Sequence, residues 1–457
     1  MNINRVMIAA PKSGSGKTMI TCAILQAVKN NGKKVVSFKC GPDYIDPMFH
    51  EKIIDISSRN LDTFFTDENM TRKLFVQNVI DSEYAVMEGV MGLYDGLGGI
   101  REEGSSYHLA KVTATPIILV VDAKGMGRSV ISLIAGFLAY DTHKLIKGVI
   151  LNKMSKGYYE IMKPIIEDEL GIKVVGYFPV QKDIAIESRY LGLVMPDEIK
   201  DIKEQLQKMS EEIVKTVSIP DVLGIAESAE KIHVISDKGC EIFFQEETSC
   251  PTIAVAYDEA FCFYYKDNLQ MIQDSGANIV YFSPIYDDEV PPLASGILLG
   301  GGYPELYADK LSANKSMLAS IKNAYKKGMP IVAECGGFMY LHSKVCIQSG
   351  ESYEMADVIA ATCQYTRKLV RFGYIELEEI ESDFIPKDEK IKAHEFHYFD
   401  STYNGESCIA TKPVTGKSYN CIVKANNCWM GFPHLYYPSN PAFVKSFVNK
   451  CKLWERV

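Results

Sequence analysis

The stretch Ala10-Pro-Lys-Ser-Gly-Ser-Gly-Lys-Thr18 lies between an apolar run at residues 6–10 and a helical pattern that ends at residues 30–32. A glycine-rich turn in this position aims backbone N–H groups and a helix dipole at phosphate groups. Pro11 stands where the standard phosphate loop has its first glycine, whereas the rest of the pattern is kept. The residues that we predict to bind a nucleotide in this loop are Gly14, Ser15, Gly16, Lys17 and Thr18.

Apolar runs alternate with helical stretches in both halves of the chain, which predicts two α/β domains. The first domain, at residues 1–195, is expected to be a parallel sheet that carries the phosphate loop. Residues 196–249 are rich in charge and lack strong strand patterns, so we expect a helical linker there. The second α/β domain is expected at residues 250–457.

Composition limits the classes of function that are open to the chain. Its 457 residues exceed the size of one ordinary core, and its charged fraction of 23% is typical of globular proteins. A net charge of -9 argues against a broad nucleic-acid-binding face. Neither a leader pattern nor an apolar run of membrane length is found, so we expect a cytoplasmic protein without a membrane partner. Twelve cysteines show no paired metal-ligand spacing.

Carboxylates follow two neighbouring predicted strands of the first domain. Asp43 and Asp46 come after the second strand, and Glu88 and Asp95 come after the third. Ligands bind at the carboxyl edge of such sheets, and magnesium prefers hard oxygen ligands. Taken singly, each carboxylate also fits a turn or cap. Together they predict a site in which Thr18, Asp43 and Glu88 hold Mg²⁺, and Asp43, Asp46 and Asp95 contact substrate.

Two further positions in the first domain leave alternatives open. Asn152 follows the fifth strand and is a candidate for reading an adenine base, although an asparagine at a strand end also forms turns. Arg189, within residues 188–193, is a candidate contact for an anionic substrate, and an ordinary surface arginine is the alternative.

Cys335 lies in a strand that runs into a sharp turn, Pro330-Ile-Val-Ala-Glu-Cys-Gly-Gly337. Such an elbow exposes a nucleophile, and a following helix N-terminus lowers the pKa of a thiol. The loop Gly300-Gly-Gly-Tyr-Pro-Glu305 offers the backbone N–H groups of Gly301 and Gly302 to an oxyanion. A base is needed to activate the thiol. The candidates for this base are His394, His397 and His434.

These motifs resemble those of one known family, the glutamine-dependent cobyrinic acid a,c-diamide synthases, over almost the whole chain. The segments that carry the resemblance are residues 14–18, 39–47, 88–96, 258–265 with Asn268, 300–305, 334–337 and 394–397. It implies a dethiobiotin-synthetase-like ATP domain followed by a class I glutamine amidotransferase domain. Cys335 would be the nucleophile and His434 its base. ATP and Mg²⁺ would activate a carboxylate of a corrinoid tetrapyrrole acid as an acyl phosphate, and ammonia from L-glutamine would attack it.

The resemblance also implies that Asp258, Tyr264, Tyr265 and Asn268 contact the macrocycle, although the same block is compatible with an aromatic core. One departure concerns the group behind His434, because Tyr436 stands where family members commonly have a second histidine. We therefore assign no third member of a triad. Glu305 and Glu395 are available.

Alternatives remain for the substrate and for the class of protein. The same two amidations on hydrogenobyrinic acid or on a nickel sirohydrochlorin would use the same motifs. A nucleotide-switch protein of the partitioning type would share the phosphate loop, but it has no use for a reactive thiol beside an oxyanion loop. A homodimer is one option for the assembly.

Overall fold

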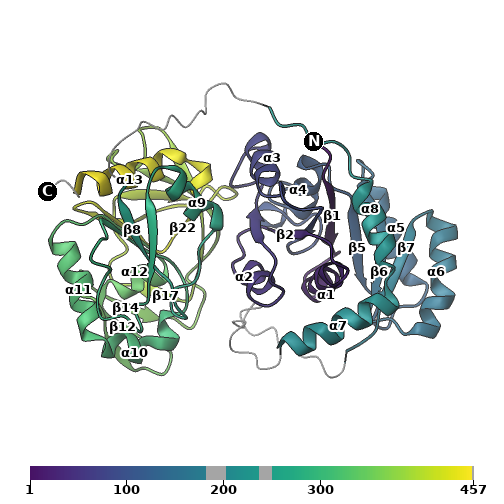
Figure 1. The fold of residues 1–457 in the computed structure, drawn as a ribbon, viewed down its shortest axis with the longest axis horizontal. Coiled ribbons are helices and arrows are strands. Elements are labelled where there is room, and N and C mark those ends of the chain that lie inside the picture. The colour runs from purple at the N-terminus through teal and green to yellow at the C-terminus, as the bar shows by residue number, and fades with distance from the viewer. Residues whose placement is uncertain (182–201, 236–249, 455–457) are drawn as a thin grey trace. The chain divides into compact units, whose positions relative to one another are not determined.

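The computed structural model describes residues 1–181, 202–235 and 250–454. The chain divides into two compact units, Met1–Ser236 and Asp237–Val457, whose elements are labelled in Figure 1. Each unit has its own sheets and its own hydrophobic core. None of the helices in these described parts combines the length and apolar character needed to cross a bilayer.

The first unit is built on a seven-stranded sheet in the order β3-β2-β4-β1-β5-β6-β7. Every neighbouring pair is parallel. The strands are β1 (Asn4–Ala9), β2 (Val35–Cys40), β3 (Ser58–Leu61), β4 (Tyr84–Glu88), β5 (Ile117–Asp122), β6 (Ile146–Asn152) and β7 (Lys173–Phe178). Parallel strands joined by helices bring all of their carboxyl ends to one edge, which is where the phosphate loop and the predicted carboxylates lie.

Helices cover this sheet, and one face carries a continuous core of α1, α7, α8 and the inward residues of the central strands. The helices of the first unit are α1 (Lys17–Asn30), α2 (Ile45–Lys52), α3 (Glu68–Gln77), α4 (Ser106–Val112), α5 (Ser129–Tyr140), α6 (Lys156–Leu170), α7 (Ile202–Thr216) and α8 (Ile219–Glu227). Figure 1 shows α7 near α1, and the two helices are in contact.

The segment expected to be a helical linker differs from that expectation over its described part. Helices α7 and α8 pack against α1 and β1 and therefore belong to the first unit. The fully buried guanidinium of Arg5 donates hydrogen bonds to the backbone oxygens of Thr113, Ala114 and Glu230. The N-terminal amino group of Met1 also donates to Ile232 O at 2.9 Å. These bonds fix the chain beyond α8 to the start of β1.

The second unit is built on a six-stranded sheet in the order β20-β21-β11-β10-β8-β9, in which only the β20–β21 pair is antiparallel. Its strands are β8 (Thr252–Ala256), β9 (Asn278–Phe282), β10 (Gly296–Leu299), β11 (Ile331–Glu334), β20 (Val423–Ala425) and β21 (Cys428–Gly431). Successive side chains of β10 alternate between two cores, since Ile297 and Leu299 join one cluster and Leu298 joins the other.

Two smaller sheets and a set of helices complete the second unit. One sheet contains β12 (His342–Cys346), β13 (Ser352–Glu354), β14 (Ile359–Tyr365) and β17 (Phe399–Ser401). The other contains β15 (Arg371–Glu379), β16 (Lys390–His397), β18 (Cys408–Thr411), β19 (Ser418–Cys421) and β22 (His434–Leu435). The helices are α9 (Lys266–Asp274), α10 (Ala308–Ala313), α11 (Lys315–Lys326), α12 (Gly336–Tyr340) and α13 (Pro441–Trp454). The predicted fold class, two α/β units with a parallel sheet first, is confirmed.

Candidate functional site

Cys335 occupies a sharp elbow between β11 and α12. Its backbone has φ 48° and ψ -102°, a conformation that L residues rarely adopt and that persists only where the surroundings hold it. The Cys335 amide donates to Gly431 O at 2.8 Å, and the Cys335 carbonyl accepts from the Met339 amide at 2.9 Å. Both backbone groups of the residue are thus fixed, which leaves the thiol as the group that the turn presents.

The two glycines after Cys335 are required by close packing. A Cβ on Gly337 would lie 2.2 Å from Leu299 O, and a Cβ on Gly336 would lie 3.1 Å from the amide nitrogen of Gly302. The elbow therefore presses against the end of β10 and the glycine-rich loop that follows it. This contact places the predicted oxyanion loop directly beside the residue that follows the nucleophile.

His434 reaches the same loop from β22. A Cβ on Gly301 would lie only 2.4 Å from His434 Cε1, so the imidazole lies against the bare backbone of that glycine. On its other side His434 stacks on His394, with ring centroids 4.8 Å apart. The loop at Gly301 and Gly302 thus touches both the elbow of Cys335 and the ring of His434, and the structure brings these four predicted residues together.

Burial controls the protonation of this pair. It raises the pKa of the Cys335 thiol, and the charge of Glu305 adds to the effect. The sequence predicted a lower pKa from a helix N-terminus, but α12 has only five residues and burial outweighs it. Burial, followed by the neighbouring His397, lowers the pKa of His434 to about 3. The thiol and the imidazole are therefore both neutral, which is the state from which general base activation starts.

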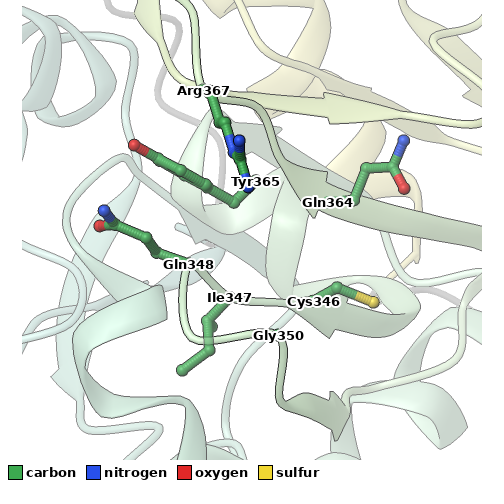
Figure 2. A pocket seen from close by; sticks show the side chains of 7 residues that line it. All are labelled: Cys346, Ile347, Gln348, Gly350, Gln364, Tyr365 and Arg367. Carbon is green, nitrogen blue, oxygen red and sulfur yellow. The ribbon is translucent and has the colours of Figure 1, made fainter.

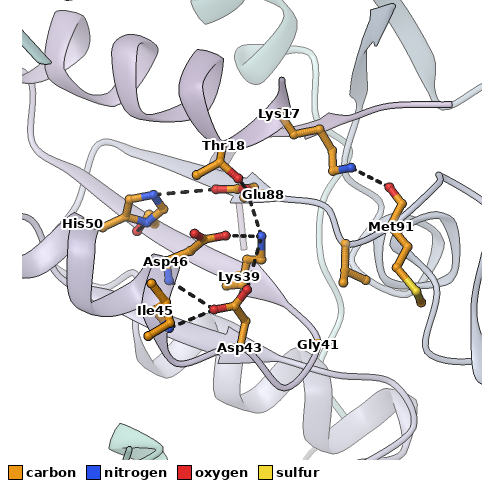
Figure 3. Close-up of polar contacts among 12 residues, drawn as sticks. Lys17, Thr18, Lys39, Gly41, Asp43, Ile45, Asp46, His50, Glu88 and Met91 are labelled. Carbon is orange, nitrogen blue, oxygen red and sulfur yellow. Dashed lines mark hydrogen bonds and ion pairs between the residues drawn. The ribbon is translucent and has the colours of Figure 1, made fainter. Parts of the chain in front are cut away.

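In the first unit, the phosphate loop ends in Lys17, which points to the backbone of Met91, and Thr18, which points to Glu88 in a polar cluster (Figure 3). Gly14 and Gly16 have φ values of 75° and 92°, which favour glycine. Lys17 Nζ donates to Met91 O at 2.5 Å, and Thr18 Oγ1 donates to Glu88 Oε1 at 2.6 Å. Burial, and next the charge of Lys39, lower the pKa of Lys17 to about 8.

Lys39 lies at the centre of the predicted carboxylate group. Its Nζ donates to Glu88 Oε1 at 2.8 Å and to Asp46, and it lies 3.8 Å from Asp43 Oδ2. Burial raises the pKa of Glu88 to about 7 and that of Asp43 to about 6. Burial acts in the same direction on Asp46, but the Lys39 charge overrides it and lowers the pKa of that carboxyl. Asp95 stands apart from the cluster, where its Oδ2 accepts from the Gly92 amide at 3.0 Å.

Asn152 lies beneath the phosphate loop and is fully buried. Its Nδ2 donates to Ser15 O at 2.7 Å, and its Oδ1 accepts from the Lys153 amide. A Cβ on Gly16 would lie 2.3 Å from the Asn152 amide nitrogen. The Nδ2 end of the side chain thus braces the loop, and the reading of adenine by Asn152 stays a prediction. The candidate contact Arg189 lies outside the described residues.

Comparison with known proteins adds a family to this geometry. Residues 6–192 match the CobQ/CobB/MinD/ParA nucleotide binding domain, and residues 252–441 match the CobB/CobQ-like glutamine amidotransferase domain. Proteins named cobyrinate a,c-diamide synthase align with nearly the whole chain. The one from Caldanaerobacter subterraneus is 37% identical over 98% of this chain and 99% of its own. That from Listeria innocua is 38% identical over 97% and 98%, and that from Priestia megaterium is 35% identical over 99% and 98%.

The chain belongs to the cobyrinate a,c-diamide synthase family. It is an amide-forming ligase with a nucleotide-binding unit and a glutamine amidotransferase unit. Within this family the elbow, the glycine loop and His434 fall inside the matched amidotransferase domain, and the phosphate loop with Lys39 falls inside the matched nucleotide-binding domain.

The block that the resemblance assigned to the macrocycle contacts the predicted oxyanion loop. Asp258 accepts four hydrogen bonds from Ala260, Phe261, Ser283 and Ile285. The Tyr264 hydroxyl donates to Ala256 O and accepts from the Gly300 amide at 2.8 Å. The Gly301 carbonyl accepts from the amides of Cys262 and Phe263.

The other two residues of that block lie deeper in the same unit. Tyr265 is buried, with its hydroxyl 3.1 Å from His394 Nδ1, and the side chain of Asn268 bonds to the backbone of residues 435 and 437. The contacts of both residues are thus internal to the amidotransferase unit, and their contact with the macrocycle stays a prediction.

A group of charged residues lies in the same unit, of which the sequence analysis named only Glu395. Glu395 is fully buried, and the mostly buried cations Arg371 and Lys412 lie 3.5 Å and 3.6 Å from its carboxylate oxygens. The guanidinium of Arg371 also lies over the ring of Tyr419, 4.0 Å from its centroid. Glu395 acts electrostatically on both Cys335 and His434, so this group adjoins the thiol site. The residues lie on β15, β16 and β19 and on the turn after β18, so only the folded sheet gathers them.

Another hollow of the second unit lies at the β12–β13 hairpin and the end of β14 (Figure 2). It is lined by Cys346, Ile347, Gln348, Gly350, Gln364, Tyr365 and Arg367. None of these is a residue of the thiol site described above. We assign it no function.

Proposed function

We propose that this chain uses ATP and L-glutamine to convert the a and c carboxylates of cobyrinate into amides. The names of its relatives support this substrate. The observation that carries the amidotransferase half is the shared contact of the Gly301–Gly302 loop with the elbow of Cys335 and the ring of His434. A nucleotide switch needs a phosphate loop, but it has no need for that arrangement.

In the second unit, Cys335 would attack the side-chain amide carbon of glutamine. As the S–C bond forms, the thiol proton passes to the neutral imidazole of His434. The backbone amides of Gly301 and Gly302 would stabilise the oxyanion. The C–N bond then breaks, and His434 returns the proton to the departing ammonia. Water hydrolyses the thioester to glutamate and restores the thiol.

Arg371 and Lys412, the two cations beside Glu395, could bind the α-carboxylate of glutamine. About a fifth of the side-chain surface of Arg371 and of Lys412 is exposed. Both cations form ion pairs with the buried Glu395. Stacking on Tyr419 restricts the guanidinium further. We therefore place the α-carboxylate of glutamine on Arg371 and Lys412, because a pre-oriented guanidinium binds carboxylates in a bidentate manner.

In the first unit, the phosphate loop and Lys17 would hold the triphosphate, and Lys39 would neutralise charge where a substrate carboxylate meets the terminal phosphoryl group. That carboxylate attacks the phosphorus and displaces ADP, which gives an acyl phosphate. Ammonia then attacks the acyl carbon and releases phosphate. Repetition on the second carboxylate yields the diamide.

The first unit also offers ligands that fit Mg²⁺. The Thr18 hydroxyl bonds to Glu88, and Glu88 Oε2 is buried without a hydrogen-bond partner among the described residues. Among the residues that the structure describes, no group of three or more Asp, Glu, His or Cys side chains could hold a metal ion. Thr18 and Glu88, with Asp43 nearby, would therefore share the ion with phosphate oxygens, as is usual for magnesium. The ion would neutralise charge on the phosphates during transfer.

The test is amide formation from cobyrinate with ATP and Mg²⁺, followed by mass spectrometry. The wild type should form the diamide with either glutamine or ammonium chloride. Cys335→Ala should form it with ammonium chloride alone. Turnover of hydrogenobyrinate or a nickel sirohydrochlorin, and not of cobyrinate, would change the substrate and keep the chemistry. Failure with every acid while glutamine is still hydrolysed would refute the synthetase half.

A further inference from the structure

Asn268 makes an unusually complete contact with the segment that follows His434. It lies on α9 and is only 5% exposed. Its Nδ2 donates to Leu435 O at 2.8 Å, while its Oδ1 accepts from the Tyr437 amide, also at 2.8 Å. One side-chain amide thus forms hydrogen bonds with the first and the third residue of the segment 435–437. A neighbouring β-strand would bond to the same backbone groups, but here the partner is a side chain on a helix.

Glu334 approaches the same segment from the opposite element. It is the last residue of β11, immediately before Cys335, and is buried. The Leu435 backbone N–H bonds to its carboxylate, and the Tyr437 hydroxyl donates to Glu334 Oε1 at 3.5 Å. The strand that carries the nucleophile is therefore joined to the segment that carries the base.

Strand β22 needs such support because it contains only His434 and Leu435. Its pairing with β16 is limited to two positions, His394 with His434 and Ala393 with Leu435. Proton transfer requires the imidazole to stay within a fraction of an ångström of its productive place. Beyond these pairings the Tyr436 amide donates to Lys392 O of β16 at 3.0 Å, so the place of the imidazole depends on the contacts that hold residues 435–437.

We infer that Asn268 and Glu334 are positioning residues for His434, holding residues 435–437 so that the imidazole stays against Gly301 beside the elbow of Cys335. This inference rests on the proposed glutaminase role of Cys335 and His434. Neither side chain touches glutamine in it. Both act through the backbone that follows the base.

Four variants test the inference: Asn268→Ala, Asn268→Asp, Glu334→Ala and Glu334→Gln. Asn268→Ala and Glu334→Ala should lower the glutamine-dependent kcat by about 10- to 100-fold with little change in KM for glutamine. Asn268→Asp keeps the acceptor for Tyr437 but places a carboxylate against Leu435 O, so it should also lose rate. Glu334→Gln keeps volume and an acceptor, so it should restore most of the rate that Glu334→Ala loses.

Amide formation from ammonium chloride is measured in the same preparations and should stay within about twofold of wild type, since it bypasses His434. The rate at which an electrophilic glutamine analogue alkylates Cys335 should fall together with the glutamine-dependent kcat. Asn314→Ala is the matched control. That asparagine also bonds two backbone carbonyls in the second unit, those of Pro284 and Asp287, and it caps α11.

Equal losses with glutamine and ammonia, or an equal loss in Asn314→Ala, would mean general destabilisation and overturn the inference. So would a wild-type kcat in Asn268→Ala, or a Glu334→Gln variant as slow as Glu334→Ala. If the wild type itself makes no amide from glutamine, the proposed function fails first. The wild-type reaction therefore separates the two failures.

Discussion

The imidazole of His434 lies nearly parallel to that of His394, with ring centroids 4.8 Å apart and ring planes 17° apart. The two residues face each other across the β16–β22 pair. Burial lowers the pKa of both rings, and that of His434 falls to about 3. His434 is therefore neutral across the physiological range and ready to accept a proton from the thiol.

This relationship predicts the pH dependence of glutamine hydrolysis. An ordinary histidine base gives kcat/KM an acid limb near pH 6.5, because it must lose a proton before it can act. We expect no such limb for glutamine between pH 5.5 and 8. Glutamate release from glutamine is the measured rate, because ammonia-dependent synthesis changes with pH through the fraction of free NH3. A limb near pH 6.5 in glutamine hydrolysis alone would contradict a neutral His434.

Gly301→Ala should disable the glutaminase while sparing the synthetase. The new Cβ would stand 2.4 Å from His434 Cε1, so the ring must move away from the loop. A displacement near 1 Å lowers such rates by about 100-fold, and we expect a loss of that order in glutamine-dependent kcat. Gly136→Ala in α5 is the control, because its Cβ would meet nothing within 4 Å. Wild-type glutamine turnover in Gly301→Ala would refute the geometry.

Lys39→Met tests the cluster of the first unit. The substitution leaves Asp46 and Glu88 buried without their shared cation. Removing one partner of a buried ion pair costs about 3–5 kcal/mol, so thermal unfolding of the first unit should shift to lower temperature. Amide formation should be lost with either nitrogen source, whereas glutamine hydrolysis in the second unit should persist. Adding Glu88→Gln should recover part of the lost stability but none of the synthesis.

The sequence located the elements of both sites but not the partners of each side chain. The elbow and the phosphate loop follow from local rules, since glycine spacing, strand and helix all lie within a few residues. The sequence predicts no role for Lys39, because only the fold shows that its ammonium lies among three carboxylates. Arg371 and Glu395 are 24 residues apart and meet only across β15 and β16.

The contacts of two asparagines and the place of α7 go beyond what was inferred from local patterns. Asn152 and Asn268 are amides that serve a ligand and a backbone equally well, and composition cannot choose between them. For α7 a signal did exist. Leu206, Met209 and Ile213 recur at helical spacing and are buried against the sheet. Because the segment is also highly charged, these apolar residues were given less weight and a linker was expected.

Arg371→Ala should affect binding of glutamine rather than chemistry. It removes the guanidinium that Glu395 and Tyr419 hold in place. We expect KM for glutamine to rise by about tenfold or more, with kcat changed less and ammonia-dependent synthesis unchanged. Arg371→Lys should recover little, because an ammonium lacks the planar fork. Exposed Arg367 lies in the other hollow, so Arg367→Ala is the matched control. An unchanged KM in Arg371→Ala would remove this residue from the glutamine site.

Glu334→Gln should change the pH dependence of stability. Burial raises the pKa of Glu334 from 4.5 to about 8, so the folded state binds its proton more tightly than the unfolded state does. The stability that this group contributes is therefore fully present below about pH 4.5 and is lost as pH rises towards 8. A glutamine has no proton to lose, so the melting temperature of the variant relative to wild type should be higher at pH 8 than at pH 5.5. Melting curves of the two proteins at both pH values measure this. A difference that stays constant, or that has the opposite sign, would show that the carboxyl is ionised in the fold and that Tyr437 and Leu435 stabilise its charge.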